Sequence, residues 1–202
     1  MDLSSAFTDI INEKKILVLH LNHKLETFSK VFSKFEVITA LDFLKHACDK
    51  FQIPELFLNI DERTIKDDAL YSYYKLKENR RRERITPPSK LDKKFEDQFA
   101  NYILNVSPLR IESPDVFMNE EATKSIRASG KKILFITGFF TEVDVLRSSA
   151  SALDHGYIPF VISDATSTYS ERVYYEALDI ISQYNEVIDS RDLMKLWPEV
   201  VD

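Results

Sequence analysis

One histidine lies where a parallel α/β protein would place a catalytic group. His20 interrupts the apolar segment Ile16–Leu21, which has the composition of a strand buried on both faces. Functional side chains of parallel sheets gather at the carboxyl ends of strands, and a neutral imidazole can accept a proton near neutral pH. His20 is therefore a candidate general base. The alternative is a core imidazole whose nitrogens are satisfied by backbone groups, since lone histidines are frequent in apolar settings.

Asp144 is the second candidate, and it lies in the first turn of a predicted helix. The apolar run Ile133–Ile136 predicts a buried strand that stops at Gly138, and the helix is expected to begin at Thr141, whose hydroxyl suits an N-cap. A carboxyl group at this place can exchange a proton with a bound molecule. The alternative is structural, because the helix dipole and free N–H groups favour an acid there by about 0.3–1 kcal/mol.

Alternating strands and helices are predicted to position these two residues. Apolar runs predict six strands, at Ile16–Leu21, Glu55–Ile60, Pro108–Ile111, Ile133–Ile136, Ile158–Ile162 and Glu186–Ile188. Helical spacing recurs from Val37 to Cys48, from Leu91 to Ile103, from Thr141 to Gly156, and in a helix ending at Ile181. This alternation predicts an α/β fold, a Rossmann-like doubly wound parallel sheet flanked by helices.

The stretch from Lys131 to Trp197 resembles the C-terminal half of the isochorismatase-like hydrolases. That superfamily includes isochorismatases, nicotinamidases and carbamoylsarcosine amidases. The matching residues are the turn Gly138–Val145, the run Ala152–Tyr157, the pair Asp164-Ala165 and the closing Ser190–Leu193. The resemblance implies an isochorismatase-like fold for a single domain over residues 1–202, with a variable excursion at about residues 61–107.

The catalytic pattern that the resemblance implies is altered in this chain. The position of Asp144 holds a nucleophilic cysteine in ordinary members, and the position of His20 holds a general-base aspartate. The catalytic lysine falls at Ile111, beside Arg110, which can supply positive charge to a pocket but cannot exchange protons as a lysine does. Asn22 stands where those enzymes often carry a glutamine. All three positions of the Asp-Lys-Cys pattern therefore differ.

The resemblance also implies an oxyanion turn formed by Gly138, Phe139, Phe140 and Thr141. In the resembling enzymes this turn contains a non-proline cis peptide bond, which maps here to Phe139–Phe140. Gly138 has no Cβ and so permits a sharp exit from the strand. A rewired acid–base pair would further require the side chains of His20 and Asp144 to meet within hydrogen-bond reach or through one water.

Two functions are consistent with this pattern. Without the cysteine, amide cleavage by a thiolate is excluded, which favours a non-catalytic homologue that binds a small molecule or a protein. The alternative is an active isochorismatase-type hydrolase that cleaves a chorismate-derived vinyl ether, with Asp144 as proton donor and His20 as its partner.

No cofactor is expected. No metal site is predicted either, because Cys48 is the single cysteine and no Asp-x-His run follows the second strand.

Composition limits the partners. The net charge of -6 and a pI near 5.3 argue against nucleic-acid binding, so the run Arg80–Arg84, interleaved with Glu83, is predicted to be solvated surface. No apolar run approaches the roughly 20 residues that span a bilayer, and the N-terminus, with Phe7, Ile10 and Ile11 on one predicted helical face, is unlike a signal peptide. We therefore expect a cytoplasmic protein without membrane contact.

The resemblance implies a homodimer or larger homo-oligomer, formed through the helix after the fourth strand and the Tyr71–Tyr74 cluster.

Overall fold

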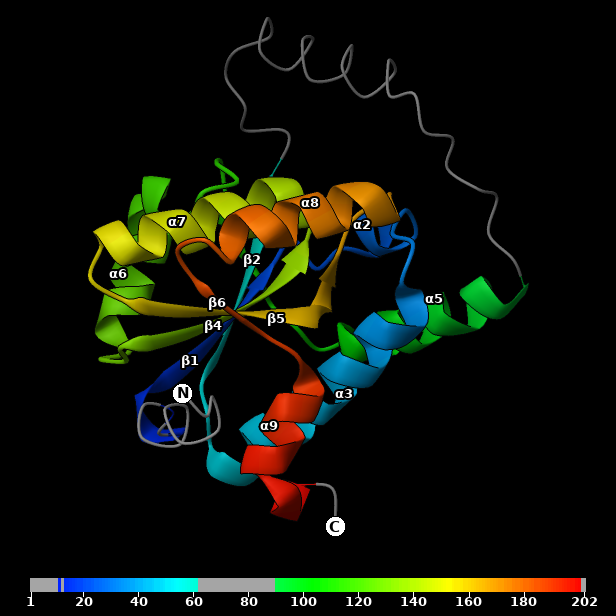
Figure 1. Ribbon diagram of the computed structural model, residues 1–202, viewed down its shortest axis with the longest axis horizontal. Helices are drawn as coiled ribbons and strands as arrows, with labels where there is room; N and C mark the ends of the chain where they lie inside the picture. The colour runs from blue at the N-terminus through cyan, green and yellow to red at the C-terminus, as the bar shows by residue number, and fades with distance from the viewer. Residues whose placement is uncertain (1–10, 12, 62–89, 201–202) are drawn as a thin grey trace, which may run out of the picture.

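The computed structural model describes Ile11, residues 13–61 and residues 90–200. Six parallel strands form one sheet in the order β3-β2-β1-β4-β5-β6 (Figure 1). Their bounds are β1 Ile16–Leu21, β2 Glu55–Ile60, β3 Leu109–Ile111, β4 Ile133–Phe139, β5 Ile158–Ser167 and β6 Glu186–Ile188. The predicted doubly wound α/β fold is confirmed. The predictions for Phe7, Ile10, Tyr71–Tyr74 and Arg80–Arg84 lie outside the described residues.

The strand order reverses between β1 and β4. The chain runs outward from β1 through β2 to β3, and then returns to place β4 on the other side of β1. In doubly wound sheets a crevice opens at the carboxyl ends of the strands where the order reverses. The register pairs His20 with Thr137 and Leu21 with Gly138, so both candidate segments reach this one crevice.

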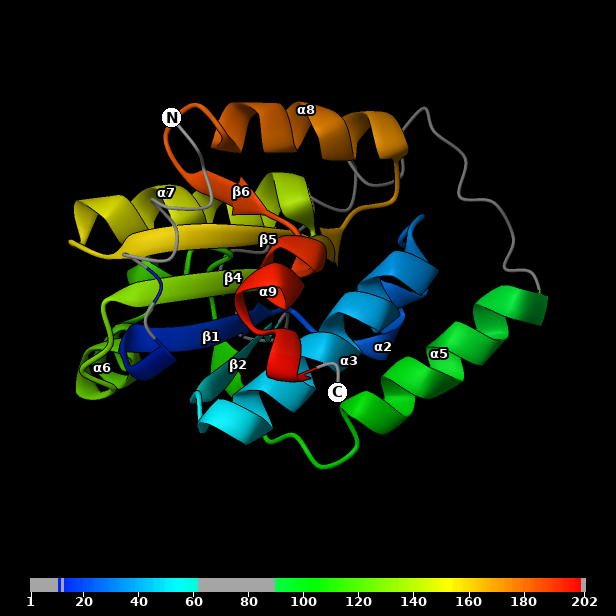
Figure 2. The ribbon, with the colours of Figure 1, turned by 60° about the horizontal axis from the view of Figure 1, so that its bottom comes forward.

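Helices cover both faces of the sheet. Their bounds are α2 Leu25–Phe28, α3 Lys34–Phe51, α5 Lys90–Tyr102, α6 Glu120–Ala128, α7 Leu146–Asp154, α8 Glu171–Ile181 and α9 Ser190–Leu196. Figures 1 and 2 show α3 and α9 on one side of the sheet and α7 and α8 on the other. Side chains alternate along a strand, so Ile16 and Val18 pack toward α3 and α9, and Leu17 and Leu19 pack toward the opposite core. His20 shares the α3 face.

The segment after β4 differs from the prediction. Both β4 and β5 are longer than their apolar runs, because Gly138 and Phe139 still pair with Thr166 and Ser167 after a register irregularity. The helix opens with one π-helical turn, η3 Thr141–Val145, before α7 begins. Thr141 does not cap it, and the predicted capping role was wrong: Phe140 is the N-cap residue, and the Thr141 hydroxyl bonds the Thr166 hydroxyl at 3.0 Å.

The helices predicted around Val37–Cys48 and Leu91–Ile103 are confirmed as α3 and α5. Residues Val37, Leu41, Leu44 and Ala47 of α3 are buried against the sheet, and Cys48 is buried with them as a small apolar side chain. The α5 helix packs through Phe99, which is fully buried and stacks on Phe28 with ring centroids 4.2 Å apart. These aromatic contacts bring α5 over the β1 end of the crevice.

Candidate active-site crevice

The turn that leaves β4 has the predicted geometry. The Phe139–Phe140 peptide bond is cis, and the preceding Gly138 has φ +123°, a value that L side chains rarely adopt. A Cβ at this position would lie 2.0 Å from the carbonyl oxygen of Leu21 on the neighbouring strand. Only glycine therefore fits between β1 and the start of the turn.

Asp144 is bound to this same turn. Its Oδ2 accepts a hydrogen bond of 2.9 Å from the Phe140 N–H, and the side chain is buried. The pKa of Asp144 is raised to about 8, mainly by burial and also by the charge of Glu142, while the Phe140 N–H and the Lys24 ammonium act in the opposite direction. Near neutral pH the carboxyl is mostly protonated. It is thus a proton donor in principle, and a poor nucleophile.

His20 is fully buried at the centre of a hydrogen-bonded chain. Its Nε2 lies 3.1 Å from Glu55 Oε1, and its Nδ1 lies 2.9 Å from the Thr137 hydroxyl. Because a carboxylate can only accept, Nε2 carries the proton and Nδ1 accepts from Thr137. The ring stacks on Phe57 with centroids 4.1 Å apart. Burial lowers the pKa of His20, although Glu55 opposes the shift, so the imidazole is neutral. Its partners are side chains rather than the backbone groups that the sequence suggested.

A second histidine joins this chain, and the sequence did not single it out. His23 is buried, and its Nε2 lies 3.4 Å from the same Thr137 hydroxyl. Its ring centroid lies 5.0 Å from that of His20 and 5.2 Å from that of Phe139, on which it stacks. Burial lowers the pKa of His23 well below its usual value, and the nearby His20 adds to the effect. The two-histidine arrangement depends on the pairing of β1 with β4.

Aromatic side chains fill the α3 side of the crevice. The ring of His23 is surrounded by Phe57, Phe99, Tyr102 and Phe139, with centroid distances between 5.2 and 6.3 Å. These rings pack around the carboxyl ends of β1 and β4. His20 is consequently sealed from solvent.

The structure does not join His20 to Asp144 directly. The His20 nitrogens bond Glu55 and Thr137, whereas the Asp144 carboxyl bonds the Phe140 N–H. Within the described part of the chain, no hydrogen bond links the two predicted partners. The direct form of the predicted acid–base contact is therefore absent, and contact through a water stays a prediction.

The remaining predicted pocket residues lie apart from one another. Asn22 follows β1 with φ 55°, its N–H donates to the Leu58 carbonyl at 2.7 Å, and its buried Oδ1 has no partner among the described residues. Arg110 belongs to β3. Two strands, β2 and β1, lie between β3 and β4 in the sheet. The Arg110 side chain is exposed and pairs with Asp61 at 3.3 Å. Its predicted pocket role remains a prediction, and the buried neighbour Ile111 brings no charge.

Other kinds of site were sought in the described ranges. Among residues 13–61 and 90–200, no group of three or more His, Cys, Asp or Glu side chains is arranged to hold a metal ion. In the same ranges no helix combines the length and apolar composition needed to cross a bilayer.

The crevice, the cis turn and the parallel sheet define a hydrolase-like α/β protein, and comparison with known proteins identifies the family. A family sequence model described as "Isochorismatase domain" matches residues 15–192. The chain belongs to the isochorismatase family.

Relatives support the same assignment. Over 65 residues the chain is 42% identical to "Probable hydrolase YcaC" of Escherichia coli (strain K12). The match covers 32% of this chain and 31% of that protein, so the chain matches about a third of the length of this curated relative. The crystal structure of the E. coli YcaC gene product, described as an octameric hydrolase of unknown specificity, aligns with a TM-score of 0.65 at 20% identity over 94% of this chain and 84% of that chain. A cysteine hydrolase from Pseudomonas syringae pv. phaseolicola aligns with a TM-score of 0.68 at 13% identity, covering 94% of this chain and 95% of that chain. These structural likenesses show the fold.

Proposed function

We propose that this protein is a non-catalytic member of the isochorismatase family that acts by binding a partner and assembling with copies of itself. The observation that carries the proposal is the hydrogen bond from the Phe140 N–H to Asp144. In the resemblance described above, this turn is the one that would bind an oxyanion. Here a side chain of the protein itself occupies its N–H group, so a substrate oxygen would have to displace a buried carboxyl.

The state of His20 supports the same conclusion. A general base has to reach the proton that it abstracts, directly or through one water. The His20 ring is enclosed by Phe57 and His23, and both of its nitrogens already have protein partners. A buried and fully bonded imidazole is a structural group. The resemblance implies that Asp144, His20 and Ile111 stand at the positions of the family's cysteine, aspartate and lysine, and an aspartate at the nucleophile position offers no thiolate.

One observation favours a second candidate function. The pKa of Asp144 is raised to about 8, so the carboxyl keeps its proton near neutral pH. Vinyl-ether cleavage begins with protonation, and general acids are often carboxyls whose pKa burial has raised. The second candidate is therefore an isochorismatase-type hydrolase in which Asp144 is the proton donor and neutral His20 supports the reaction through the crevice.

An activity assay separates the two candidates. Purified wild-type protein is incubated with isochorismate, and pyruvate release is compared with the rate in buffer. The variants Asp144→Asn and His20→Gln are assayed beside Asp154→Asn and His46→Gln, whose side chains lie exposed on α7 and α3. The non-catalytic proposal expects the buffer rate for every protein.

A different outcome would establish the second candidate. In that outcome the wild type would release pyruvate faster than buffer, Asp144→Asn would be slower than the wild type by at least about tenfold, and Asp154→Asn would keep the wild-type rate. This result would identify Asp144 as the proton donor and overturn the non-catalytic proposal. Far-UV circular dichroism of each variant checks that the loss does not come from unfolding.

Assembly is the second part of the proposal. Large apolar side chains are exposed on α7, at the start of β5 and on α8, namely Leu153, Ile158, Tyr175 and Ile180. Exposed apolar and aromatic surface is typical of interfaces, and the related YcaC is octameric. We expect at least a dimer that includes α7. A monomeric mass by light scattering at micromolar concentration would contradict this part alone. A small-molecule ligand remains a prediction of the sequence.

A further inference from the structure

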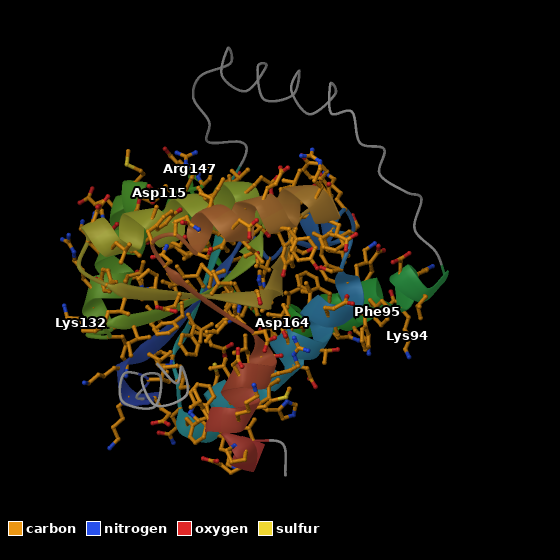
Figure 3. All side chains as sticks on the ribbon, in the orientation of Figure 1. Lys94, Phe95, Asp115, Lys132, Arg147 and Asp164 are labelled. Atoms are coloured by element: carbon orange, nitrogen blue, oxygen red, sulfur yellow. The ribbon has the colours of Figure 1, made fainter. Side chains whose placement is uncertain are left out.

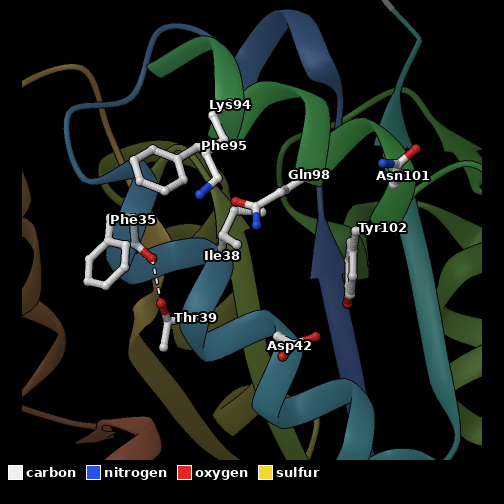
Figure 4. A pocket seen from close by; sticks show the side chains of 9 residues that line it. All are labelled: Phe35, Ile38, Thr39, Asp42, Lys94, Phe95, Gln98, Asn101 and Tyr102. Atoms are coloured by element: carbon white, nitrogen blue, oxygen red, sulfur yellow. Dashed lines mark hydrogen bonds between the residues drawn. The ribbon is translucent and has the colours of Figure 1, made fainter. Parts of the chain in front are cut away.

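His23 is the point at which α5 meets the crevice. Its buried ring lies beside Phe99 and Tyr102 of α5, with ring centroids 5.7 and 6.3 Å away. The same ring stacks on Phe139 of β4, with centroids 5.2 Å apart. Tyr102 also lines a cavity between α3 and α5 (Figure 4). The C-terminal half of α5 therefore meets the sheet around one histidine ring.

The N-terminal half of α5 is held by different contacts. Lys34, buried at the start of α3, forms ion pairs with Asp92 at 3.7 Å and Glu96 at 3.2 Å. Figures 1 and 2 show this half of the helix on the flank of the molecule, and Figure 3 labels Lys94 and Phe95 there. The ion pairs can hold this half on α3 even when the other half leaves the sheet.

The hydrogen bonds around Thr137 give the two histidines different environments. His20 donates from Nε2 to Glu55, so its Nδ1 has to accept. The Thr137 hydroxyl has a single proton, for which the His20 nitrogen at 2.9 Å is a nearer acceptor than the Leu19 carbonyl at 3.3 Å. The hydroxyl oxygen then accepts from His23 Nε2, 3.4 Å away. The other ring nitrogen of His23, Nδ1, is buried and has no hydrogen-bond partner among the described residues.

A proton added to the His23 ring would have no compensating carboxylate. The Glu55 carboxylate bonds His20 at 3.1 Å and Lys45 of α3 at 3.5 Å. The other charged or titratable groups around the ring are cationic or are uncharged near neutral pH, namely Lys24, Tyr102 and Asp144. A buried charge without an opposite partner is strongly unfavourable. The closed structure therefore accommodates His23 only as a neutral ring.

We propose that His23 is an acid-sensitive latch for α5, and that protonation of its ring releases the C-terminal half of this helix from the sheet. The helices α7 and α8 cover the opposite face of the sheet and stay folded (Figures 1 and 2). Release of Phe99 and Tyr102 uncovers the side of the crevice where His20 stacks on Phe57, so acid opens the crevice to small solutes. The latch requires neither catalysis nor assembly and goes beyond both candidate functions.

The size of the effect follows from the uptake of one proton. Opening of α5 exposes His23 and returns its pKa toward the ordinary value of 6.5, whereas in the closed form burial keeps the pKa well below that value. Because only the open form binds the proton, its population should rise about thirtyfold between about pH 7.5 and pH 5. Exposed carboxyls ordinarily titrate near about pH 4, so this range separates the histidine from them.

Hydrogen–deuterium exchange of the full chain, measured by mass spectrometry across this pH range, tests the latch. Protection factors, which remove the intrinsic pH dependence of exchange, are compared for peptides from α5, α7 and α8. In the wild type the protection of the α5 peptides should fall about thirtyfold, and that of α7 and α8 should not change. His23→Gln keeps an N–H group for the Thr137 hydroxyl and cannot become charged, so its α5 peptides should keep their protection.

Two exposed histidines provide matched controls. His46→Gln on α3 and His155→Gln at the end of α7 should behave as the wild type does. His23→Phe supplies a second uncharged ring if His23→Gln does not fold. Wild-type α5 peptides whose protection does not change with pH would overturn the latch, and so would an equal loss of protection in α5, α7 and α8. Acid release of α5 that persists in the folded His23 variants would assign the trigger to another group and overturn it as well.

Discussion

Replacing Asp144 with asparagine is expected to stabilise the protein at neutral and alkaline pH. The pKa of the folded carboxyl is about 8, against 3.8 for an ordinary aspartate. Since the folded-state pKa is raised, the unfolded chain releases this proton at a lower pH than the folded protein does. The favourable contribution of Asp144 is complete below about pH 4 and is lost as the pH rises toward 8. Asparagine keeps an oxygen for the Phe140 N–H and never ionises.

The size of the effect follows from the shift. A change from 3.8 to about 8, at ~1.4 kcal/mol per pKa unit, gives an upper limit of about 6 kcal/mol at pH 8. Local relaxation and water entry around an ionised carboxylate reduce this limit, so we expect a measured gain of about 2–3 kcal/mol in the Asp144→Asn variant. As the pH falls below 3.8 the wild type and the variant should come to differ little, because the carboxyl is then protonated in the unfolded chain as well as in the folded protein.

Urea unfolding between about pH 4.5 and 9 measures this difference directly. Far-UV circular dichroism follows the helices, and the fluorescence of Trp197, which is buried against Phe51 and Phe135, gives a second signal. Asp154→Asn, at an exposed position of α7, is the matched control and should show no trend with pH. A loss of stability in Asp144→Asn at pH 8, or a difference that does not vary with pH, would refute the reasoning and mean that the folded carboxyl is ionised.

Two further predictions concern the same crevice. Gly138→Ala should destabilise the protein by more than ~3 kcal/mol, because its Cβ would meet the Leu21 carbonyl at 2.0 Å, whereas Gly130→Ala meets nothing within 4 Å and should cost only ~1–2 kcal/mol. Similar melting temperatures for the two variants would contradict this. The pKa of His23 is lowered in the folded protein, so its contribution to stability is lost as the pH falls below about 6.5, where the unfolded chain binds a proton. His23→Phe should therefore shift the midpoint of acid unfolding to lower pH, and the exposed control His46→Gln should leave it in place.

The strands could be predicted because their signal is local. A strand buried on both faces is a continuous apolar run, as in β1, whose six residues are all buried. The bounds of β1, β2 and β6 are those predicted. The predicted ends of β4 and β5 were too early. Gly138 and Asp164 have low strand propensity, and β4 and β5 continue past them because each strand pairs with a neighbour that is already in place. The cis bond at Phe139–Phe140 came from the family resemblance and is confirmed.

The site could be predicted only in part, because its chemistry depends on tertiary contacts. The sequence singled out His20 and Asp144 but gave no reason to pair His20 with Glu55, which lies 35 positions away. His23 follows the strand by two residues, and its role appears only when the register of β1 and β4 sets both histidines beside Thr137. The raised pKa of Asp144 likewise results mainly from burial, which depends on the folded structure.

Asp144, His20 and His23 share one property that bears on function. Burial favours the neutral form of Asp144 and also of His20 and His23. An active site that lowers a barrier electrostatically holds fixed charges and dipoles toward the place where charge develops in the transition state. Here the imidazoles bond to Thr137, the carboxyl bonds to the Phe140 N–H, and the Phe139 ring stacks on His23. A charge that developed in this crevice during a reaction would be poorly solvated, because the crevice is buried and its titratable groups are neutral. For this physical reason we favour a binding and assembly role over hydrolysis.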